Sequence, residues 1–222
     1  MIRTREELDK ALSDDLIWRR RELTDLRSLA QGEVPTLRSN VVRRAGIALL
    51  YAHWEGFVKK ASHYYLEYVA SQRLKYSDLA PNFVALAIKA RYEQLRVSKR
   101  LSAANEIAAF YCGNLDRASN VPYKNTVETQ SNLSSVVLED IILALGLDFD
   151  GFRVRSNFID LSVVGRRNHV AHGEYLDIDL KEYLEFHDDV LALIVMFKTE
   201  IENAIVLKKY LRAHGDVATA DA

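Results

Sequence analysis

The chain is poor in the residues that break or cross-link a polypeptide. Its 222 residues include 9 Gly, 3 Pro and a single cysteine, Cys112. One cysteine excludes an internal disulfide and a zinc site built from cysteines. So few glycines and prolines favour long uninterrupted helices. The sequence has neither a glycine-rich phosphate loop nor the alternating apolar pattern of a strand, which leaves a helical protein.

Long apolar runs and an excess of charge are also missing. No stretch is long enough to span a membrane, and the start MIRTREE lacks the apolar core of a signal peptide. We therefore expect a cytoplasmic protein without a membrane partner. A formal net charge of −1 argues against a general nucleic-acid coat, which needs many phosphate contacts, but allows a local basic site. Candidate basic clusters, with solvated helix faces as the alternative, are residues 19–21, 43–44 and 96–100.

The apolar residues recur at the spacing of long helices. Thr4 and Glu7 form a capping box before a helix that extends to about residue 30. The next helix, about 37–74, is apolar on nearly all sides at its centre, which predicts the central core helix. Asp179 and Glu182 begin a last long helix that reaches about residue 211. Shorter helices are predicted for residues 82–96, for 102–111, from a Ser131–Asn132 cap to Leu145 with Gly146 closing it, and from residue 156 or 157 to Gly173. Residues 148–155 are predicted to be a connector.

These patterns predict an all-α fold, a helical bundle of long antiparallel helices with additional short helices. We expect one domain over residues 1–212 and a flexible tail over 213–222. Residues 115–129 have the composition of a loop, and loops of this length often lie over a site. Tyr123 and Lys124 in that loop can contact a nucleotide or can simply be solvated. His53 and Glu55 are polar in an apolar run, so they are hydrogen-bonded core groups or line a cleft.

The densest polar cluster within an apolar setting is residues 163–175, VVGRRNHVAHGEY. On a helical wheel, Arg167 projects into an apolar sector, where an arginine is costly unless it has a partner or faces a cleft. Asn168 and His172 are i, i+4 neighbours, and His172 lies roughly 140° around the axis from Arg167. Either the helix unwinds near Gly173 and brings His172 closer to Arg167, or a second copy of the chain completes a site.

Residues 167–172, RNHVAH, resemble the Arg-x4–6-His signature of the HEPN superfamily. Two more blocks resemble one prokaryotic branch, the HEPN-like nucleases of the RiboL-PSP-HEPN type. The first block is residues 50–59, LYAHWEGFVK, and the second block is residues 131–138, SNLSSVVL. Three blocks in the same order cover most of the chain, which makes the resemblance far more specific than the hexapeptide alone.

The resemblance implies a metal-independent endoribonuclease that leaves a 2′,3′-cyclic phosphate. Arg167 and His172 are the expected catalytic residues, because a guanidinium clamps phosphoryl oxygens and an imidazole transfers protons near neutral pH. With one such pair, a single imidazole would have to act first as the base and then as the acid. In the family, two protomers bring their signatures face to face. The expected partners are an RNA substrate, a second copy in a homodimer, and an antitoxin or another protein of a defence or toxin system. No cofactor and no metal are expected.

Four further residues are expected to bind or orient the substrate: Asn168, Arg166, His169 and Tyr175. Some HEPN toxins carry a modified tyrosine two residues after the histidine, a position that is Glu174 here, which puts that control in doubt. Three alternatives stay open. Arg167 can be paired with a buried acid such as Glu139 or Asp140 in a plain scaffold. His169, His172 and Glu174 offer metal-ligand types. The chain can also be a non-catalytic HEPN module that binds RNA, a nucleotide or a partner protein.

Overall fold

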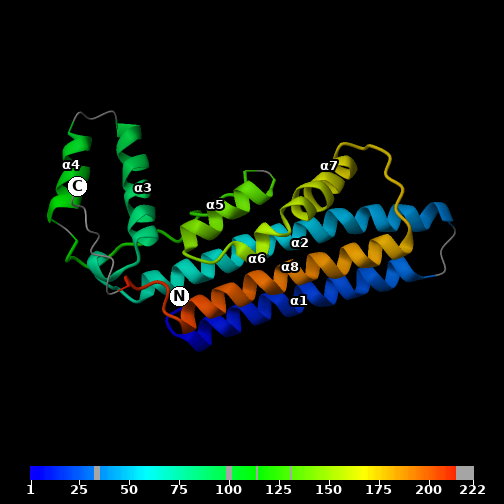
Figure 1. Cartoon of the computed structure of the whole chain (residues 1–222), viewed down its shortest axis with the longest axis horizontal. Coiled ribbons are helices and arrows are strands. Elements are labelled where there is room, and N and C mark those ends of the chain that lie inside the picture. Colours follow the sequence, from blue (N-terminus) through cyan, green and yellow to red (C-terminus); the bar gives the residue numbers. More distant parts are fainter. Residues whose placement is uncertain (33–35, 99–101, 114, 131, 214–222) are drawn as a thin grey trace.

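The computed structural model of the chain describes residues 1–32, 36–98, 102–113, 115–130 and 132–213, and three long helices dominate it (Figure 1). They are α1 (Arg5–Gln31), α2 (Thr36–Ser71) and α8 (Leu180–Val206). Each contacts the other two, and α1 runs antiparallel to both α2 and α8. Within the described ranges the chain forms helices and two isolated β-bridges but no strand. The predicted all-α class with long antiparallel helices is confirmed.

The capping box predicted for α1 is present. The Glu7 N–H donates to the Thr4 hydroxyl, and the Glu7 carboxylate accepts from the Thr4 N–H, each at 3.2 Å. These bonds satisfy donors that the first helical turn leaves open. The apolar stripe of α1 is buried against the other long helices: Leu8, Leu12, Leu16, Leu23 and Leu26. The sequence pattern thus correctly indicated both the start and the buried face of α1.

The core is centred on α2, as its apolar middle predicts. Trp54 is fully buried there, and its ring centroid lies 6.4 Å from that of Phe152 and 6.3 Å from that of Phe197. Aromatic groups at such distances add to the free energy already gained by burying their area. Gly46 lets the Tyr183 ring of α8 lie directly against the backbone of α2, because a Cβ at Gly46 would collide with that ring.

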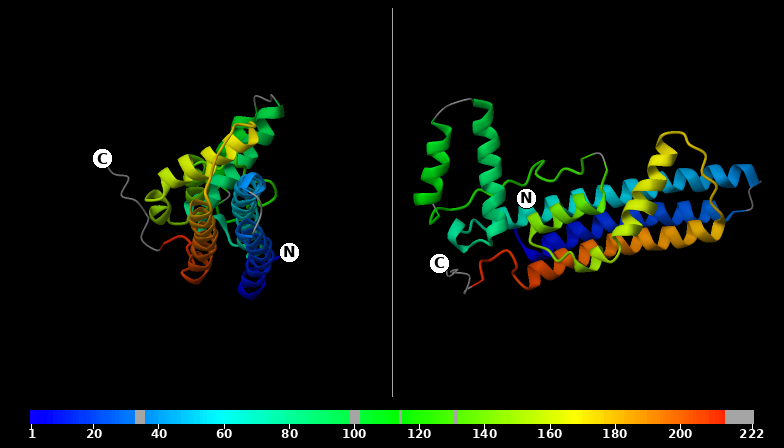
Figure 2. Two further views of the ribbon diagram at one scale, coloured as in Figure 1. Left: turned by 90° about the vertical axis from the view of Figure 1, so that its right-hand side faces the viewer. Right: turned by 45° about the horizontal axis from the view of Figure 1, so that its top comes forward.

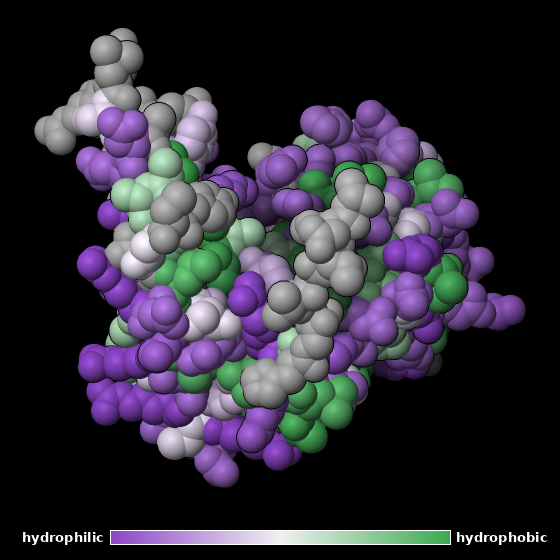
Figure 3. Space-filling view, turned by 60° about the vertical axis from the view of Figure 1, so that its left-hand side comes forward, coloured by the Kyte–Doolittle hydropathy of each residue, from purple (hydrophilic) through white to green (hydrophobic). Residues whose placement is uncertain are grey.

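The shorter elements extend from the long helices in two directions. The hairpin of α3 and α4 projects from one end, and the other short segments lie across one side of α2 (Figures 1 and 2). Seen from the hairpin end, the visible surface is mostly hydrophilic with small separate hydrophobic patches (Figure 3). The short elements are η1 (Tyr76–Asp78), α3 (Pro81–Ser98), α4 (Ala103–Gly113), α5 (Ser135–Leu145), α6 (Asp150–Arg153), the π-helical η2 (Phe158–Val164) and α7 (Gly165–Ala171). No helix among the described residues combines the length and the apolarity needed to cross a membrane.

Several predicted boundaries are wrong. The cap of α5 is Ser134, whose hydroxyl accepts from the Val137 N–H, rather than Asn132 or Ser131, and Ser131 lies outside the described residues. The Asn132 side chain instead accepts a hydrogen bond from Arg167. Gly146 closes α5 in the left-handed conformation, as predicted. The long helices α2 and α8 end a few residues before the predicted 74 and 211, and the predicted connector contains α6. From residue 214 on, the predicted tail lies outside the described residues.

Candidate active site

The helix that carries the signature begins as a π-helix. In η2 the backbone takes the wider π turn, and at Gly165 it passes into α7. The Gly165 N–H donates to the carbonyls of Asp160 and Ser162 at this junction. The predicted extent, from residue 156 or 157 to Gly173, is close to the observed one, but the regular helical geometry assumed for the wheel is interrupted by η2. A π turn holds more residues than an α turn, so it rotates every following side chain around the axis, and such turns are frequent at functional sites.

The side chain of Asp160 ties this π segment to the start of α5. Its two carboxylate oxygens accept from the Ser135 N–H at 2.7 Å and from the Ser135 hydroxyl at 2.6 Å. Two short bonds to one residue fix both the position and the rotation of the first turn of α5. The loop just before α5, which carries Asn132, is held in place by the same contact.

Arg167 lies at the meeting point of the three sequence blocks. Its Nη1 donates to the side-chain oxygen of Asn132 at 2.9 Å and to that of Asn168 at 2.8 Å. Its guanidinium carbon lies 4.7 Å from the centre of the Tyr51 ring, a cation–π distance. Tyr51 belongs to the first block, Asn132 to the second, and Arg167 with Asn168 to the signature. Segments more than a hundred residues apart in sequence thus orient one guanidinium.

Tyr51 in turn is fixed from both sides. It is buried, and its hydroxyl accepts from the Leu133 N–H at 2.8 Å. Burial raises the pKa of the Tyr51 phenol, so it remains neutral beneath the guanidinium. Glu55 follows one turn later on α2 and contacts Thr129 and Lys59. Burial acts to raise the pKa of Glu55, but the hydrogen bonds from Thr129 and Lys59 outweigh it and lower that pKa, which keeps Glu55 charged.

Two partners of Arg167 are side-chain amides. Amide oxygens are uncharged acceptors, so both hydrogen bonds orient the guanidinium and leave its positive charge intact. In the plain-scaffold alternative, Arg167 is paired with a buried acid such as Glu139 or Asp140. The Glu139 carboxylate lies 3.8 Å from Arg153. Tyr51 and Asn132 were not singled out from the sequence as partners of Arg167. The sequence offered one indication: Tyr51 and Asn132 lie in the two blocks that accompany the signature.

His172 occupies the exposed end of the same short helix. It is the C-terminal cap of α7, its N–H donates to the Asn168 carbonyl at 2.9 Å, and its residue is exposed to solvent. Gly173 follows with a φ of +73°, the left-handed conformation expected where a helix stops. Asn168 therefore meets Arg167 through its side chain and His172 through its backbone. The anchored guanidinium and the accessible imidazole are only one and a half turns apart along α7.

The other predicted site residues lie around this helix in different roles. Arg166 forms an ion pair with Glu182 and lies 5.3 Å from the centre of the Phe186 ring, so it fastens α7 to α8. His169 pairs with Glu174 at the exposed helix end. Tyr175 is 79% exposed and extends from the loop beyond. The structure thus brings Arg167 and Asn168 together, and directs Arg166 towards α8.

The loop that follows the signature is held by the beginning of α2. Arg44 donates through Nη2 to the Glu174 carbonyl at 2.7 Å, and Asn40 donates to the Leu176 carbonyl at 3.3 Å. These bonds hold the chain just beyond His172 close to α2. Across the described part of the chain, no three His, Cys, Asp or Glu side chains are grouped so that they could hold a metal ion.

The arrangement offers a fixed cation and an accessible proton carrier five residues apart in the sequence. A guanidinium presents several N–H donors in a rigid fork that matches phosphate oxygens. An exposed imidazole can take up and return a proton. Both groups are presented on one short surface helix. Such a pair suits the binding and transfer of a phosphoryl group.

Comparison with known proteins yields one match. A family model described as HEPN_MAE_28990-like HEPN matches residues 8–210. No curated protein and no solved structure matches the chain. The predicted HEPN superfamily is confirmed, although the matching model does not bear the name of the RiboL-PSP-HEPN type. HEPN domains are ribonucleases or nucleotide-binding modules. With a match that spans nearly all of its length, the chain belongs to the HEPN_MAE_28990-like HEPN family.

Proposed function

We propose that this protein is a metal-independent endoribonuclease of a prokaryotic defence or toxin system, with Arg167 and His172 as its catalytic residues. One observation carries the proposal. Three separate segments converge to orient the Arg167 guanidinium through Tyr51, Asn132 and Asn168, while the same short helix ends in an exposed histidine. A plain scaffold needs no such convergence of three segments on one guanidinium.

In the proposed reaction the RNA 2′-hydroxyl oxygen attacks the adjacent phosphorus. The bond from the 2′-oxygen to phosphorus forms, and the bond from phosphorus to the 5′-oxygen breaks, which leaves a 2′,3′-cyclic phosphate and a free 5′-hydroxyl. The imidazole of His172 accepts the proton of the 2′-hydroxyl, and an imidazolium returns a proton to the departing 5′-oxygen. Arg167 stabilises the extra negative charge that builds up on the phosphoryl oxygens.

Two protonation roles and one histidine assigned to catalysis per chain, His172, favour a site built by two copies. One imidazole acts as the base and the imidazole of the second copy acts as the acid. Exposed apolar side chains on the short elements that precede α7 in the chain support such a pairing, because large apolar groups at a surface mark contact sites. They lie on α5, after α6 and on the π segment: Val136 (73% exposed), Leu143 (60%), Val154 (84%) and Leu161 (74%). A two-fold dimer is also the commonest assembly.

Cleavage of labelled RNA in the presence of EDTA tests the proposal. The wild-type protein is expected to cleave and to form the cyclic phosphate end, whereas Arg167→Ala and His172→Ala are expected to be inactive yet folded and dimeric. Mixing His172→Ala with the wild-type protein tests the shared site. If one site needs the imidazoles of both copies, mixed dimers are inactive, and the variant lowers the activity of the wild-type protein.

The outcomes separate the candidate functions. Undiminished cleavage by His172→Ala would reject the assignment of that residue. Binding without cleavage by the wild-type protein, between about pH 5 and pH 9, would instead identify a non-catalytic HEPN module. A partner that silences the enzyme, such as an antitoxin, belongs to the same proposal, because an active ribonuclease must be restrained in its own cell.

A further inference from the structure

The loop that leads into the second block runs along α2 for a considerable length (Figure 2, right). Three contacts fix it there in antiparallel order. The Leu133 N–H donates to the Tyr51 hydroxyl at 2.8 Å, Thr129 contacts Glu55, and His63 bonds to the Tyr123 carbonyl at 2.8 Å. From Tyr51 to His63 the helix advances by about 18 Å. The loop therefore follows α2 over that length, from Tyr51 at the candidate site to His63, and we call this stretch the α2 track.

A cavity of about 370 Å³ lies on this track, and its charged groups are basic. Arg19, Lys59, Lys60 and His63 line it, together with Gly56, Tyr123, Asn125, Thr126 and Val127. None of these lining residues is acidic. The nearby acids are already engaged, since Asp15 is paired with Arg19 at 2.7 Å and Glu55 with Lys59 at 2.9 Å. Three permanent cations against two carboxylates leave a net positive cavity.

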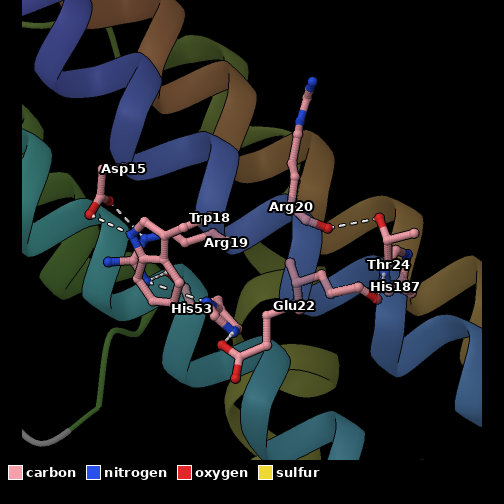
Figure 4. A network of polar contacts seen from close by, with 9 residues as sticks. Asp15, Trp18, Arg19, Arg20, Glu22, Thr24, His53 and His187 are labelled. Atoms are coloured by element: carbon pink, nitrogen blue, oxygen red, sulfur yellow. Dashed lines mark hydrogen bonds and ion pairs between the residues drawn. The ribbon is translucent and has the colours of Figure 1, made fainter.

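Arg19 is built into the wall of this cavity. Its side chain is 8% exposed, and it is held between the carboxylate of Asp15 and the backbone of α2, where Nη1 donates to the His53 carbonyl at 3.2 Å (Figure 4). Gly56 makes room for it, because a Cβ at Gly56 would lie 3.0 Å from Nη1. Burying a cation in this way is costly without partners. The fixed arginine therefore places permanent positive charge in the wall of the cavity.

The same cavity offers a surface for a base. Tyr123 is half-buried, its ring centroid lies 5.6 Å from that of His63, and the Lys124 ammonium is 5.8 Å from its centre. Because His63 bonds to the backbone carbonyl of Tyr123, the tyrosine side chain is not needed for that contact. Proteins that bind single strands combine a positive groove for the phosphates with aromatic rings on which bases stack.

We propose that this α2 track, defined by Arg19, Lys59, Lys60, His63 and Tyr123, binds the single-stranded RNA that flanks the scissile phosphate. The proposal rests on the proposed ribonuclease function. Lys59 and Lys60 contact phosphates of the strand, Arg19 adds fixed positive charge, and Tyr123 stacks on a base. The distance from Tyr51 to His63 spans at most about five nucleotides at the rise of roughly 3.4 Å per stacked nucleotide. Substrates longer than that bind more tightly than a dinucleotide does.

The test measures binding of fluorescein-labelled single-stranded RNA of about 12 nucleotides to the His172→Ala protein, which cannot cut the probe. The double variant Lys59→Gln/Lys60→Gln is expected to weaken binding roughly tenfold and to lower the slope of log K against log salt by about 1.4, the value for two phosphate contacts to a single strand. The matched control Lys10→Gln/Lys208→Gln removes the same charge from two exposed lysines that do not line the cavity, one near the start of α1 and one just after α8, and is expected to change neither.

A second pair of variants guards against effects on folding. Tyr123→Phe keeps the aromatic face and is expected to bind as before, whereas Tyr123→Leu is expected to lose affinity. With the histidine restored, Lys59→Gln/Lys60→Gln is expected to raise KM for the long RNA and to leave the cleavage of a dinucleotide unchanged.

The two proposals fail in different ways. Binding that is weakened by the lysine variants in a protein that cleaves nothing would support the α2 track and reject the ribonuclease. Cleavage by a protein in which the lysine pair and its control behave alike would overturn the α2 track and leave the ribonuclease standing. A protein that binds no RNA at this probe length would also overturn the α2 track.

Discussion

Asn132 provides the sharpest test of how Arg167 is used. One substitution there removes the hydrogen-bond acceptor of the guanidinium, and another keeps the acceptor but gives it a negative charge. Asn132→Ala removes the 2.9 Å hydrogen bond to the guanidinium. A hydrogen bond to a charged group is worth about 1.5–3 kcal/mol. Arg167 is half-buried and keeps its contacts with Asn168 and Tyr51, so the lower figure applies. A loss of about 1.5 kcal/mol of transition-state stabilisation corresponds to a roughly tenfold fall in kcat/KM.

Asn132→Asp keeps the contact but adds a negative charge. The new carboxylate would lie on the opposite side of the guanidinium from the substrate, about 6 Å from a bound phosphate if each hydrogen bond is about 2.9 Å long. At an effective dielectric constant of about 20, repulsion at that distance amounts to about 2–3 kcal/mol. This predicts a loss of about 30- to 150-fold in kcat/KM, more than the alanine variant loses. The folded protein should nevertheless be at least as stable as Asn132→Ala.

Single-turnover cleavage of a defined RNA, together with thermal unfolding of each variant, measures both effects. Asn203→Asp, which places the same charge at an exposed position on α8, is the matched control and should retain full activity. If Asn132→Asp proved as active as Asn132→Ala, or more so, the charge of Arg167 would not act on a phosphate. The assignment of Arg167 as a catalytic residue would then be wrong.

Two predictions concern the scaffold. Gly46→Ala should lower the free energy of unfolding by about 1 kcal/mol, because overpacking against the buried Tyr183 ring costs about 1–3 kcal/mol and the gain in helix propensity returns about 1. Denaturant unfolding measures this free energy. In a Tyr183→Phe background, Gly46→Ala should lower it by less. A Gly46→Ala protein that is more stable than the wild type would contradict the prediction. Burial lowers the pKa of His53 although Glu22 opposes the shift, so below about pH 6.5 the unfolded chain binds more protons and stability falls. Melting temperatures at about pH 7.5 and pH 5.5 should differ less in His53→Gln, and an unchanged difference would contradict this.

The sequence predicted the scaffold well where the signals are local. The capping box at Thr4, the left-handed stop at Gly146 and the buried stripe of α1 each depend on residues within one or two turns. Boundaries failed where a side chain serves a distant segment. Asn132 has the chemistry of a helix cap, but its side chain accepts from Arg167, and the cap of α5 lies two residues later at Ser134.

The surroundings of Arg167 could be predicted only in part. The wheel correctly indicated that Arg167 needs a partner, because it places the residue in an apolar sector. It assumed a regular helix, whereas the π segment before Gly165 alters the rotation of everything that follows. No local pattern in residues 158–164 signals that change, and we have no physical account of why this stretch takes the π form. The partners come from segments 35 and 116 residues away, which periodicity cannot reach.

The contrast between the two signature residues bears on the proposed pairing of two copies of the chain. Arg167 is fixed by partners from three segments, and such preorganisation favours charge stabilisation because nothing has to move when the charge appears. His172 caps a helix of only seven residues and is exposed, so a single protomer leaves the proton carrier loosely placed. Proton transfer requires the imidazole within about 3 Å of the reacting oxygen. A second copy packed against α7 would supply both the missing constraint and the second imidazole, so dimerisation and catalysis should be lost together when the apolar Leu161 is replaced by a charged residue.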